Sequence, residues 1–382
     1  MIRVAWLVPG GVAPRGAGMH IPALTQLAER LSDEVELTVF SFSDGHSTGT
    51  DTIGRGTVRF LPVRVQSAAW TRGRALFSAF HRDHIRRPFH LIHAFWALPS
   101  GVHATMLGTA YRLPSIVTFP GGDMASIAAI GYGNLLSTRS RLLTRLVARR
   151  ASVLHLLSEY QREQLVRNGI RFRSSLTLPF GVDESLFFPV KKRTSPPWNI
   201  LHVSNLTEVK DQRTLLRAFD IMRMSRPCRL RIVGPDRMDG ALQNFCTELG
   251  LSDLVEFMGH IPYGELPMQY AWAHLYLHSS LHEGQSVSVV EAMASGVPVC
   301  GTRVGILADL ENVCVRCVPP GEHVGLARTA SDVLADSEQY ERMARAGLEW
   351  AGDHTLAWTA NGLREVYHAF GKPNAELTGG VR

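Results

Sequence analysis

The sequence predicts two α/β domains, each a parallel β-sheet with helices on both faces. Three observations support this fold class. The 382 residues are enough for two domains, and short apolar runs rich in β-branched residues alternate with helical patterns throughout. The apolar runs are continuous rather than alternating, which is typical of strands buried on both faces. A composition of 45% hydrophobic and 19% charged residues excludes a largely disordered chain.

Twelve strands are expected from these runs. Six lie in the first half, at 4–8, 35–40, 91–95, 115–119, 153–157 and 176–180, and six in the second, at 200–203, 230–233, 255–258, 275–278, 297–300 and 313–318. Helical patterns fit between them. Such alternation predicts doubly wound, Rossmann-like sheets, whose ligands bind beyond the carboxyl ends of the strands.

A charged, proline-rich segment without periodicity separates the two halves. We therefore place an N-terminal domain at 1–188, a linker at 189–198 and a second domain at 199–354. The remaining residues, 355–382, are expected to form a helix and a tail, and the helix could pack back toward the first domain.

Charge is distributed unevenly between the halves. Residues 1–190 carry a net charge of +9 and residues 191–382 one of −3, so the first half is expected to meet an anionic partner. A nucleic acid fits poorly, because no basic and aromatic surface accompanies the charge and the second half is acidic. An anionic membrane surface fits segments 72–87 and 138–150, where apolar residues are interleaved with arginines. The alternative is that each apolar stripe packs on its own sheet, which we prefer for 138–150 and leave open for 72–87.

No targeting segment is visible, and the uncharged stretch 88–111 contains histidines and a proline that make it a poor membrane span. We expect a cytoplasmic protein, peripheral on the inner face of the membrane if the basic segments dock there.

The first candidate site is a glycine-rich turn at Gly10 and Gly11, followed by Gly16, Gly18 and a helix expected from near His20. Missing side chains let backbone amides approach a phosphate at a helix start. The spacing is not GxGxxG and no acidic residue ends the next strand, which disfavours a nicotinamide dinucleotide. A plain strand–helix turn that needs glycine is the alternative.

The second candidate site is more specific. Glu283 and Glu291 are separated by seven residues, in a small, polar stretch that opens a helix ending near Ala294. Backbone amides of residues 285–287 would be free at that helix start to bind a diphosphate. A helical rise of about 12 Å would separate the two carboxylates, at roughly 1.5 Å per residue, and each could accept hydrogen bonds from sugar hydroxyls.

The stretch HEGQSVSVVEAMASGVPV at 282–299 resembles the signature of glycosyltransferase family 4, retaining enzymes of the GT-B fold. The similarity covers nearly the whole chain in order, with further blocks at 91–95, 118–123, 151–160, 179–183, 201–211, 232–235 and 255–259. The resemblance implies two Rossmann-like domains facing each other across a cleft.

The resemblance also implies residue roles. Glu283 would hold hydroxyls of the donor sugar near the reacting carbon, Glu291 would hold the ribose hydroxyls, and Lys210 would neutralise the diphosphate. The other donor-binding positions would be Gly11 for loop closure, Asn205, the nucleobase segment Met258, Gly259 and His260, and the diphosphate loop Gly284, Gln285, Ser286 and Val287.

Three positions depart from the family pattern. Asn205 stands where members usually carry arginine, Asp211 where they carry glycine, and Pro120 where they carry an acceptor-side histidine. Loss of the arginine removes one cation from the diphosphate pocket. The candidates to replace the histidine are His93, His103 and Asp123, although a lone histidine in an apolar run is more often a core residue.

The implied reaction transfers a hexose from a nucleotide-diphosphate sugar to a hydroxyl of a glycan or lipid-linked acceptor, with retention at the anomeric carbon. No cofactor is expected. No metal is expected either, because the chain contains no Asp-x-Asp and Lys210 with a helix start would stabilise the leaving diphosphate. One alternative is a catalytically silent, nucleotide-sugar-binding partner subunit. The other is a nucleotide-sugar 2-epimerase, which shares the two-domain fold without the paired glutamates.

Overall fold

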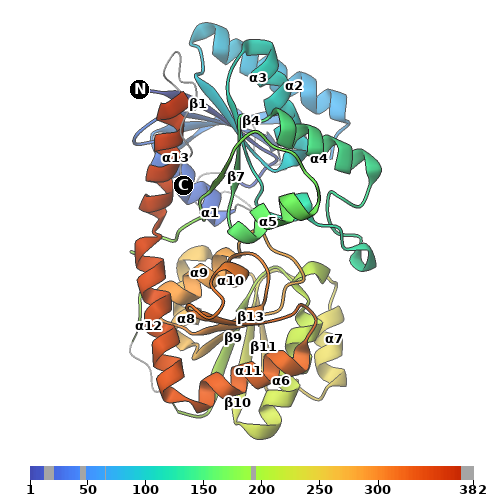
Figure 1. Cartoon of the computed structure of the whole chain (residues 1–382), viewed down its shortest axis with the longest axis vertical. Helices are drawn as coiled ribbons and strands as arrows, with labels where there is room; N and C mark the ends of the chain where they lie inside the picture. The colour runs from blue at the N-terminus through green and yellow to red at the C-terminus, as the bar shows by residue number, and fades with distance from the viewer. Residues whose placement is uncertain (13–20, 44–48, 65, 191–194, 371–382) are drawn as a thin grey trace. The chain divides into compact units, whose positions relative to one another are not determined.

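The computed structural model describes residues 1–12, 21–43, 49–64, 66–190 and 195–370 (Figure 1). The chain forms two compact units. Unit 1 consists of Met1–Leu157, Gln161–Pro179 and Leu356–Arg382, and unit 2 of Ser158–Tyr160 and Phe180–Thr355. Gly16, Gly18, His20, part of the expected linker and the tail from residue 371 lie outside the described residues.

Unit 1 is built on an eight-stranded sheet in the order β3-β4-β2-β1-β5-β6-β7-β8. Only the β3–β4 pair is antiparallel among the described pairings. The strands are β1 Arg3–Val8, β2 Glu36–Ser43, β3 Gly49–Ile53, β4 Gly56–Arg64, β5 Leu91–Phe95, β6 Ser115–Thr118, β7 Val153–Leu156 and β8 Ser175–Thr177. The six strands expected here are present. The β3–β4 hairpin was not predicted, because β3 is mostly exposed and neither strand forms a continuous apolar run.

Helices cover the unit 1 sheet and bury its apolar strands. They are α1 Pro22–Leu31, α2 Ala69–Arg86, α3 Val102–Tyr111, α4 Thr138–Arg150, α5 Glu159–Arg167 and α13 Leu356–Phe370, with short turns η1 Ala97–Gly101, η2 Gly122–Met124 and η3 Ala128–Ile130. The helix α13 follows the last crossing of the chain from unit 2 and lies beside β1 within unit 1 (Figure 1). Trp6 on β1 donates through Nε1 to the hydroxyl of the fully buried Tyr367 at 3.0 Å.

Unit 2 contains a six-stranded, wholly parallel sheet in the order β11-β10-β9-β12-β13-β14. The strands are β9 Trp198–Val203, β10 Cys228–Val233, β11 Val255–Gly259, β12 Leu275–His278, β13 Val299–Thr302 and β14 Val315–Val318. All six expected strands are present. The order reverses between β9 and β12, which makes the carboxyl ends of these two strands the topological switch point where a ligand is expected.

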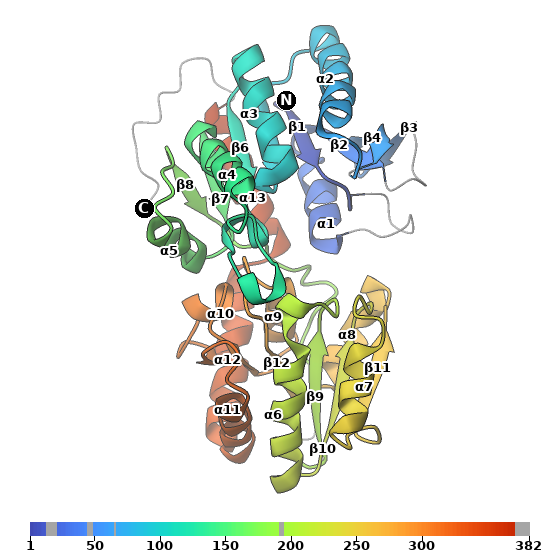
Figure 2. The same ribbon diagram turned by 90° about the vertical axis from the view of Figure 1, so that its right-hand side faces the viewer.

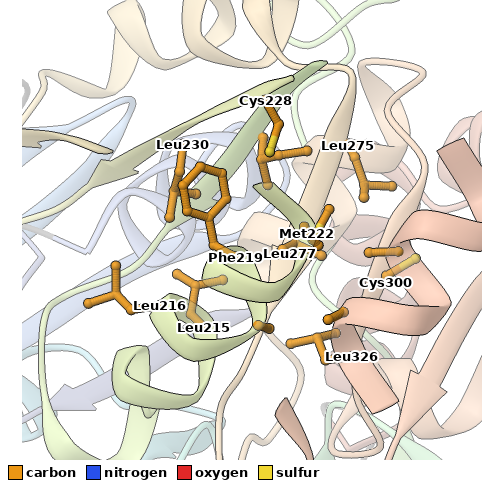
Figure 3. Packing of buried hydrophobic residues seen from close by; sticks show 14 of the residues in the cluster. Leu215, Leu216, Phe219, Met222, Cys228, Leu230, Leu275, Leu277, Cys300 and Leu326 are labelled. Atoms are coloured by element: carbon orange, nitrogen blue, oxygen red, sulfur yellow. The ribbon is translucent and has the colours of Figure 1, made fainter. Parts of the chain in front are cut away.

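Helices lie on both faces of the unit 2 sheet (Figure 2). They are α6 Gln212–Ser225, α7 Ala241–Glu248, α8 Leu266–Trp272, α9 Val287–Ala294, α10 Ile306–Asp309, α11 His323–Ala335 and α12 Ser337–Asp353, with turns η4 Glu208–Lys210 and η5 Tyr263–Glu265. On one face, Phe219 and Met222 of α6 pack against Leu230 and Leu275 (Figure 3). Burial of one such side chain contributes roughly 1.5–3 kcal/mol. A second cluster, which includes Val289 of α9, covers the other face.

The unit boundary in the structure lies between Pro179 and Phe180 rather than at residue 188. Within unit 2, Val182 forms an isolated parallel bridge with Thr355. A Cβ on Gly181 would lie 2.2 Å from the carbonyl carbon of Thr355, so only glycine permits this approach. Among the described residues, no helix combines the length and apolar character needed to cross a bilayer.

Candidate active site

The carboxyl ends of β9 and β12 bring the predicted site residues of unit 2 together. The chain leaves β9 into residues 204–211 and leaves β12 into residues 279–286. Two hydrogen bonds tie these loops to each other, from Ser279 Oγ to the Lys210 carbonyl at 2.8 Å and from the Leu281 amide to the Val209 carbonyl at 2.8 Å. Side chains from both loops therefore meet at the switch point.

An ion pair joins the two predicted catalytic residues. Lys210 Nζ lies 2.5 Å from Glu283 Oε1. Asp211, at a φ of 47°, caps α6 by accepting from the Thr214 amide at 3.2 Å, which fixes the turn that presents Lys210. Lys210 and Glu283 were expected to contact different parts of a donor, and their pairing was not predicted from the sequence.

All the described polar contacts of the Glu283 side chain are made by one carboxylate oxygen, Oε1. Besides Lys210, Oε1 accepts from Ser280 Oγ at 2.7 Å and lies 3.3 Å from His278 Nε2. In the described part of the chain, Oε2 has no hydrogen-bond partner, so it is the oxygen left to accept from a ligand. Burial favours the neutral acid, but the charge of Lys210 and the contact with His278 outweigh it and hold the pKa of Glu283 well below its ordinary value. Glu283 is therefore ionised at neutral pH.

Ser280 and His278 were not predicted as site residues. The available signal was their place, three and five residues before Glu283 at the end of an expected strand.

Glu291 occupies a different environment on α9. It is 4% exposed and accepts from Tyr270 Oη at 2.7 Å. Burial raises its pKa to about 7, against the opposing effect of hydrogen bonds from Tyr270 and Tyr263. The two glutamates therefore differ in charge near neutral pH: Glu283 is an anion, and Glu291 exchanges its proton there.

The helix start between the two glutamates is shorter than predicted. Helix α9 begins at Val287, and Ser286 has a φ of 78°, so residues 283–286 are not helical. The expectation of an unbroken helix from Glu283 to Glu291, from which a rise of about 12 Å was calculated, is therefore wrong. Among the described residues, the backbone N–H groups of Ser286 and Val287 donate to no protein acceptor, which leaves them available to an anion.

The Gln285 side chain and the Gly284 carbonyl form hydrogen bonds within the protein and are therefore not available to a ligand. The Gln285 side chain accepts from the Phe180 amide at 2.8 Å and donates to the Phe180 carbonyl at 2.6 Å. The Gly284 carbonyl accepts from Ser158 Oγ at 2.7 Å. These bonds fix the loop in front of α9.

The proposed nucleobase segment lies at the edge of the unit 2 sheet. Met258 and Gly259 end β11, which is separated from β9 by β10, and His260 is exposed just beyond. Two strand spacings of roughly 4.8 Å place this segment about 10 Å from β9. Asn205, exposed after β9, accepts through its carbonyl from Gln212 Nε2 at 3.1 Å. An extended ligand could therefore run along the carboxyl edge of the sheet.

In unit 1, Gly11 follows β1 with a φ of 80°, and a Cβ there would lie 2.8 Å from the Ile21 side chain. Both the backbone conformation at Gly11 and the close approach of Ile21 therefore favour glycine at this position.

His93 is a core residue, and the expectation that it contacts an acceptor is wrong. It is 0% exposed, with Nδ1 2.6 Å from Tyr367 Oη and Nε2 2.7 Å from Thr118 Oγ1. Thr118 Oγ1 lies 2.8 Å from His155 Nδ1, and His155 Nε2 lies 2.7 Å from the Leu178 carbonyl.

This buried chain of hydrogen bonds has only one possible direction. The Trp6 N–H can only donate and the Leu178 carbonyl can only accept. Tyr367 must therefore donate to His93, His93 to Thr118, and Thr118 to His155. Each neutral histidine carries its proton on Nε2.

His103 and Asp123 are also buried, but each keeps an unsatisfied atom. Within the described ranges, His103 Nδ1 and Asp123 Oδ2 have no hydrogen-bond partner. Burial, with the charge of Arg72, lowers the pKa of His103 to about 4. Burial raises the pKa of Asp123 to about 6, against the Ala97 amide, which donates to its Oδ1 at 2.8 Å.

Comparison with known proteins identifies the class. Residues 183–350 match the family model "Glycosyl transferases group 1", and residues 17–181 match "Glycosyl transferase 4-like domain". Sucrose-phosphate synthase from Thermosynechococcus elongatus superposes with a TM-score of 0.83 at 20% identity, over 96% of this chain and 98% of that one. The fold is thus that of the GT-B glycosyltransferases. The two family matches indicate a glycosyltransferase of this fold, with the 4-like domain preceding the group 1 domain.

Two curated relatives are similar over part of the chain. The MMP alpha-(1->4)-mannosyltransferase of Mycolicibacterium hassiacum is 30% identical over 193 residues, which are 50% of this chain and 46% of that protein. The GDP-mannose-dependent alpha-(1-6)-phosphatidylinositol monomannoside mannosyltransferase of Mycolicibacterium smegmatis is 28% identical over 62% of this chain and 66% of that protein. The matched region therefore spans less than two thirds of each relative.

Proposed function

We propose that this protein is a retaining hexosyltransferase that uses a nucleotide-diphosphate sugar. One observation carries the proposal. Lys210 and Glu283 meet at the switch point of the unit 2 sheet. On the same loop, α9 opens with the amides of Ser286 and Val287, which have no acceptor among the described residues. A cation and free amides suit a diphosphate, while a carboxylate oxygen suits the hydroxyls of a sugar.

The residues would then act on different parts of the donor. Oε2 of Glu283 accepts from a sugar hydroxyl, and the three donors around Oε1 hold the carboxylate in place. Lys210 and the two amides stabilise the negative charge that develops on the leaving diphosphate, and Glu291 binds the ribose. The departing phosphate takes the proton of the acceptor hydroxyl on the face it leaves, which retains the anomeric configuration.

The acceptor side is proposed to lie on unit 1, with a glycan or lipid-linked hydroxyl as acceptor. His103 and Asp123 are the candidates that keep an unsatisfied polar atom. The relative named for a phosphatidylinositol monomannoside supports a lipid-linked acceptor.

Helix α2 is the part of unit 1 proposed to contact an anionic membrane surface. Leu76 and Phe80 of its apolar stripe are buried in unit 1, whereas Trp70 and Ile85 are 67% and 63% exposed. Arg82 is also exposed on this helix. On α4, Val147 is buried and Leu142 and Leu146 are exposed, so the expected stripe is divided between core and surface. These exposed groups support a peripheral protein at the inner face of the membrane.

Donor turnover by the purified protein tests the function. We expect hydrolysis of GDP-mannose or UDP-glucose in the absence of acceptor, and loss of that activity in Glu283→Gln, which keeps the size of the side chain. Tight donor binding without any turnover would instead support a silent partner subunit. Release of a 2-epimeric sugar would support an epimerase.

A further inference from the structure

His278, the last residue of β12, lies in contact with Glu283, and in the reaction described above it only helps to hold that carboxylate. It is 2% exposed. Its Nε2 is 3.3 Å from Glu283 Oε1, and its Nδ1 is 3.4 Å from Thr302 Oγ1.

Both ring nitrogens of His278 face acceptors. Thr302 donates its only hydroxyl hydrogen to the Ser280 carbonyl at 2.6 Å, so it presents a lone pair to Nδ1. Glu283 Oε1 is an ionised carboxylate oxygen. A neutral imidazole has a single N–H and leaves one of the two contacts unsatisfied, whereas an imidazolium donates to both. The hydrogen-bonding geometry therefore fits the protonated ring.

Two effects keep the proton off His278 in the free protein. Burial comes first, and the positive charge of Lys210 adds to it, so the pKa of His278 is lowered despite Glu283. The charged and titratable groups that face His278 are Glu283, Lys210 on the turn after β9 and His202 on β9.

His202 does not share this proton. It donates from Nδ1 to the Leu277 carbonyl at 2.8 Å, and its Nε2 lies 2.7 Å from Ser204 Oγ. Burial lowers its pKa to about 3, so it stays neutral.

A bound donor would change the balance of electric charge around His278. The diphosphate of a nucleotide sugar carries two negative charges, whereas Lys210 supplies one positive charge and Asn205 supplies none. Resting on the function proposed above, we propose that donor binding draws one proton onto His278, whose imidazolium becomes the second positive charge of the pocket.

The sign of the pH dependence follows from linkage. A group that gains a proton on binding makes binding tighter as pH falls, by at most about tenfold per pH unit. The window lies between the lowered pKa of His278 in the free protein and its higher value in the complex. Glu291 can release a proton in the same step, because a carboxylate accepts better than an acid. The contribution of His278 is therefore isolated by comparing variants that all keep Glu291.

The proton count can be measured by titration calorimetry of GDP-mannose and of UDP-glucose. Each donor is titrated near neutral pH in two buffers of different ionisation enthalpy. Their diphosphates are esterified at both ends, so they have no proton that titrates there. The test variant is His278→Gln, whose amide can still donate to Glu283 but cannot become charged. His368→Gln, at an exposed position on α13, is the matched control.

We expect wild type and His368→Gln to take up the same number of protons per donor bound. That number should exceed the uptake of His278→Gln by up to one proton. Equal uptake by wild type and His278→Gln would overturn the inference while leaving donor binding, and thus the proposed function, intact. Failure of folded wild type to bind either donor would overturn both. A second measurement needs no variant: the NMR titration of His278 in wild type should shift to higher pH when donor is added, and an unchanged titration would overturn the inference.

Discussion

Lys210 Nζ lies 2.5 Å from Glu283 Oε1, although 73 positions separate the two residues in the sequence. The parallel sheet makes the pairing possible, because β9 and β12 are neighbouring strands and the chain leaves both of them at the same edge of the sheet. The pair places a cation and an ionised carboxylate at one point, and the carboxylate keeps its second oxygen for a ligand.

Replacement of Lys210 by alanine should reduce kcat/KM by roughly 10²–10³, because one preorganised charge is lost from the leaving group. The pKa of Glu283 should rise in this variant, since Lys210 is the main charge that lowers it. Arg229→Ala is the matched control, at an exposed position on β10. Unchanged kcat/KM in Lys210→Ala, with an unchanged melting temperature, would exclude the assignment.

Treatment with EDTA should leave donor turnover unchanged, because Lys210 and the α9 amides are proposed to stabilise the diphosphate without a cation. Among the described residues, no group of three or more histidine, cysteine or acidic side chains is placed to hold a metal ion. Turnover measured before and after EDTA, with magnesium or manganese added back, decides this. Activity that is lost and then restored by either metal would contradict the proposal.

Vesicles of phosphatidylglycerol should bind the protein at low salt and release it at high salt. Reversal of two exposed arginines on α2, in Arg82→Glu with Arg86→Glu, should weaken binding by at least about thirtyfold. Removal of two cations alone costs on the order of 1 kcal/mol each, and the added carboxylates are repelled by the anionic surface. Arg87 is left unchanged because it pairs with Glu36 at 2.6 Å. The control reverses two exposed arginines of unit 2, Arg229 and Arg345. Equal co-sedimentation of both double variants would argue against docking through α2.

Unit 1 should lose stability as pH falls below neutral. Burial lowers the pKa of His155 to about 4 from an ordinary value of 6.5, against a hydrogen bond to Leu178 that raises it. At pH values between these two pKa values, His155 binds a proton in the unfolded chain but not in the folded chain. Stability present above pH 6.5 is therefore lost on acidification, at about 1.4 kcal/mol per pH unit for one such group. His93 is shifted in the same direction.

Hydrogen-exchange protection of β7, which carries His155, measures this effect at pH 7 and pH 5. We expect weaker protection at pH 5 after correction for intrinsic exchange rates, and a smaller difference in His155→Asn. Equal protection at both pH values would contradict the neutral, one-directional chain from Trp6 to Leu178.

Much of the architecture could be predicted from the sequence, because continuous apolar runs mark strands buried on both faces. The twelve expected strands were located by this rule, although β8 and β11 at the sheet edges are only partly buried. The edge strand β3 and its neighbour β4 lack such runs and were missed. Site residues could be located on loops, since ligands gather at the carboxyl ends of parallel strands. Their mutual contacts could not be predicted. The Lys210–Glu283 pair depends on the register of two loops, and the burial of His93 depends on α13, a helix 274 positions away at Tyr367.

The stereochemistry of donor cleavage tests the central claim most directly. Hydrolysis of UDP-α-glucose or GDP-α-mannose by wild type is followed by proton NMR before the released sugar mutarotates, with Glu283→Gln as the inactive comparison. The account predicts that the α-anomer appears first and that Glu283→Gln releases neither anomer. Initial release of the β-anomer, or equal turnover by Glu283→Gln, would contradict it.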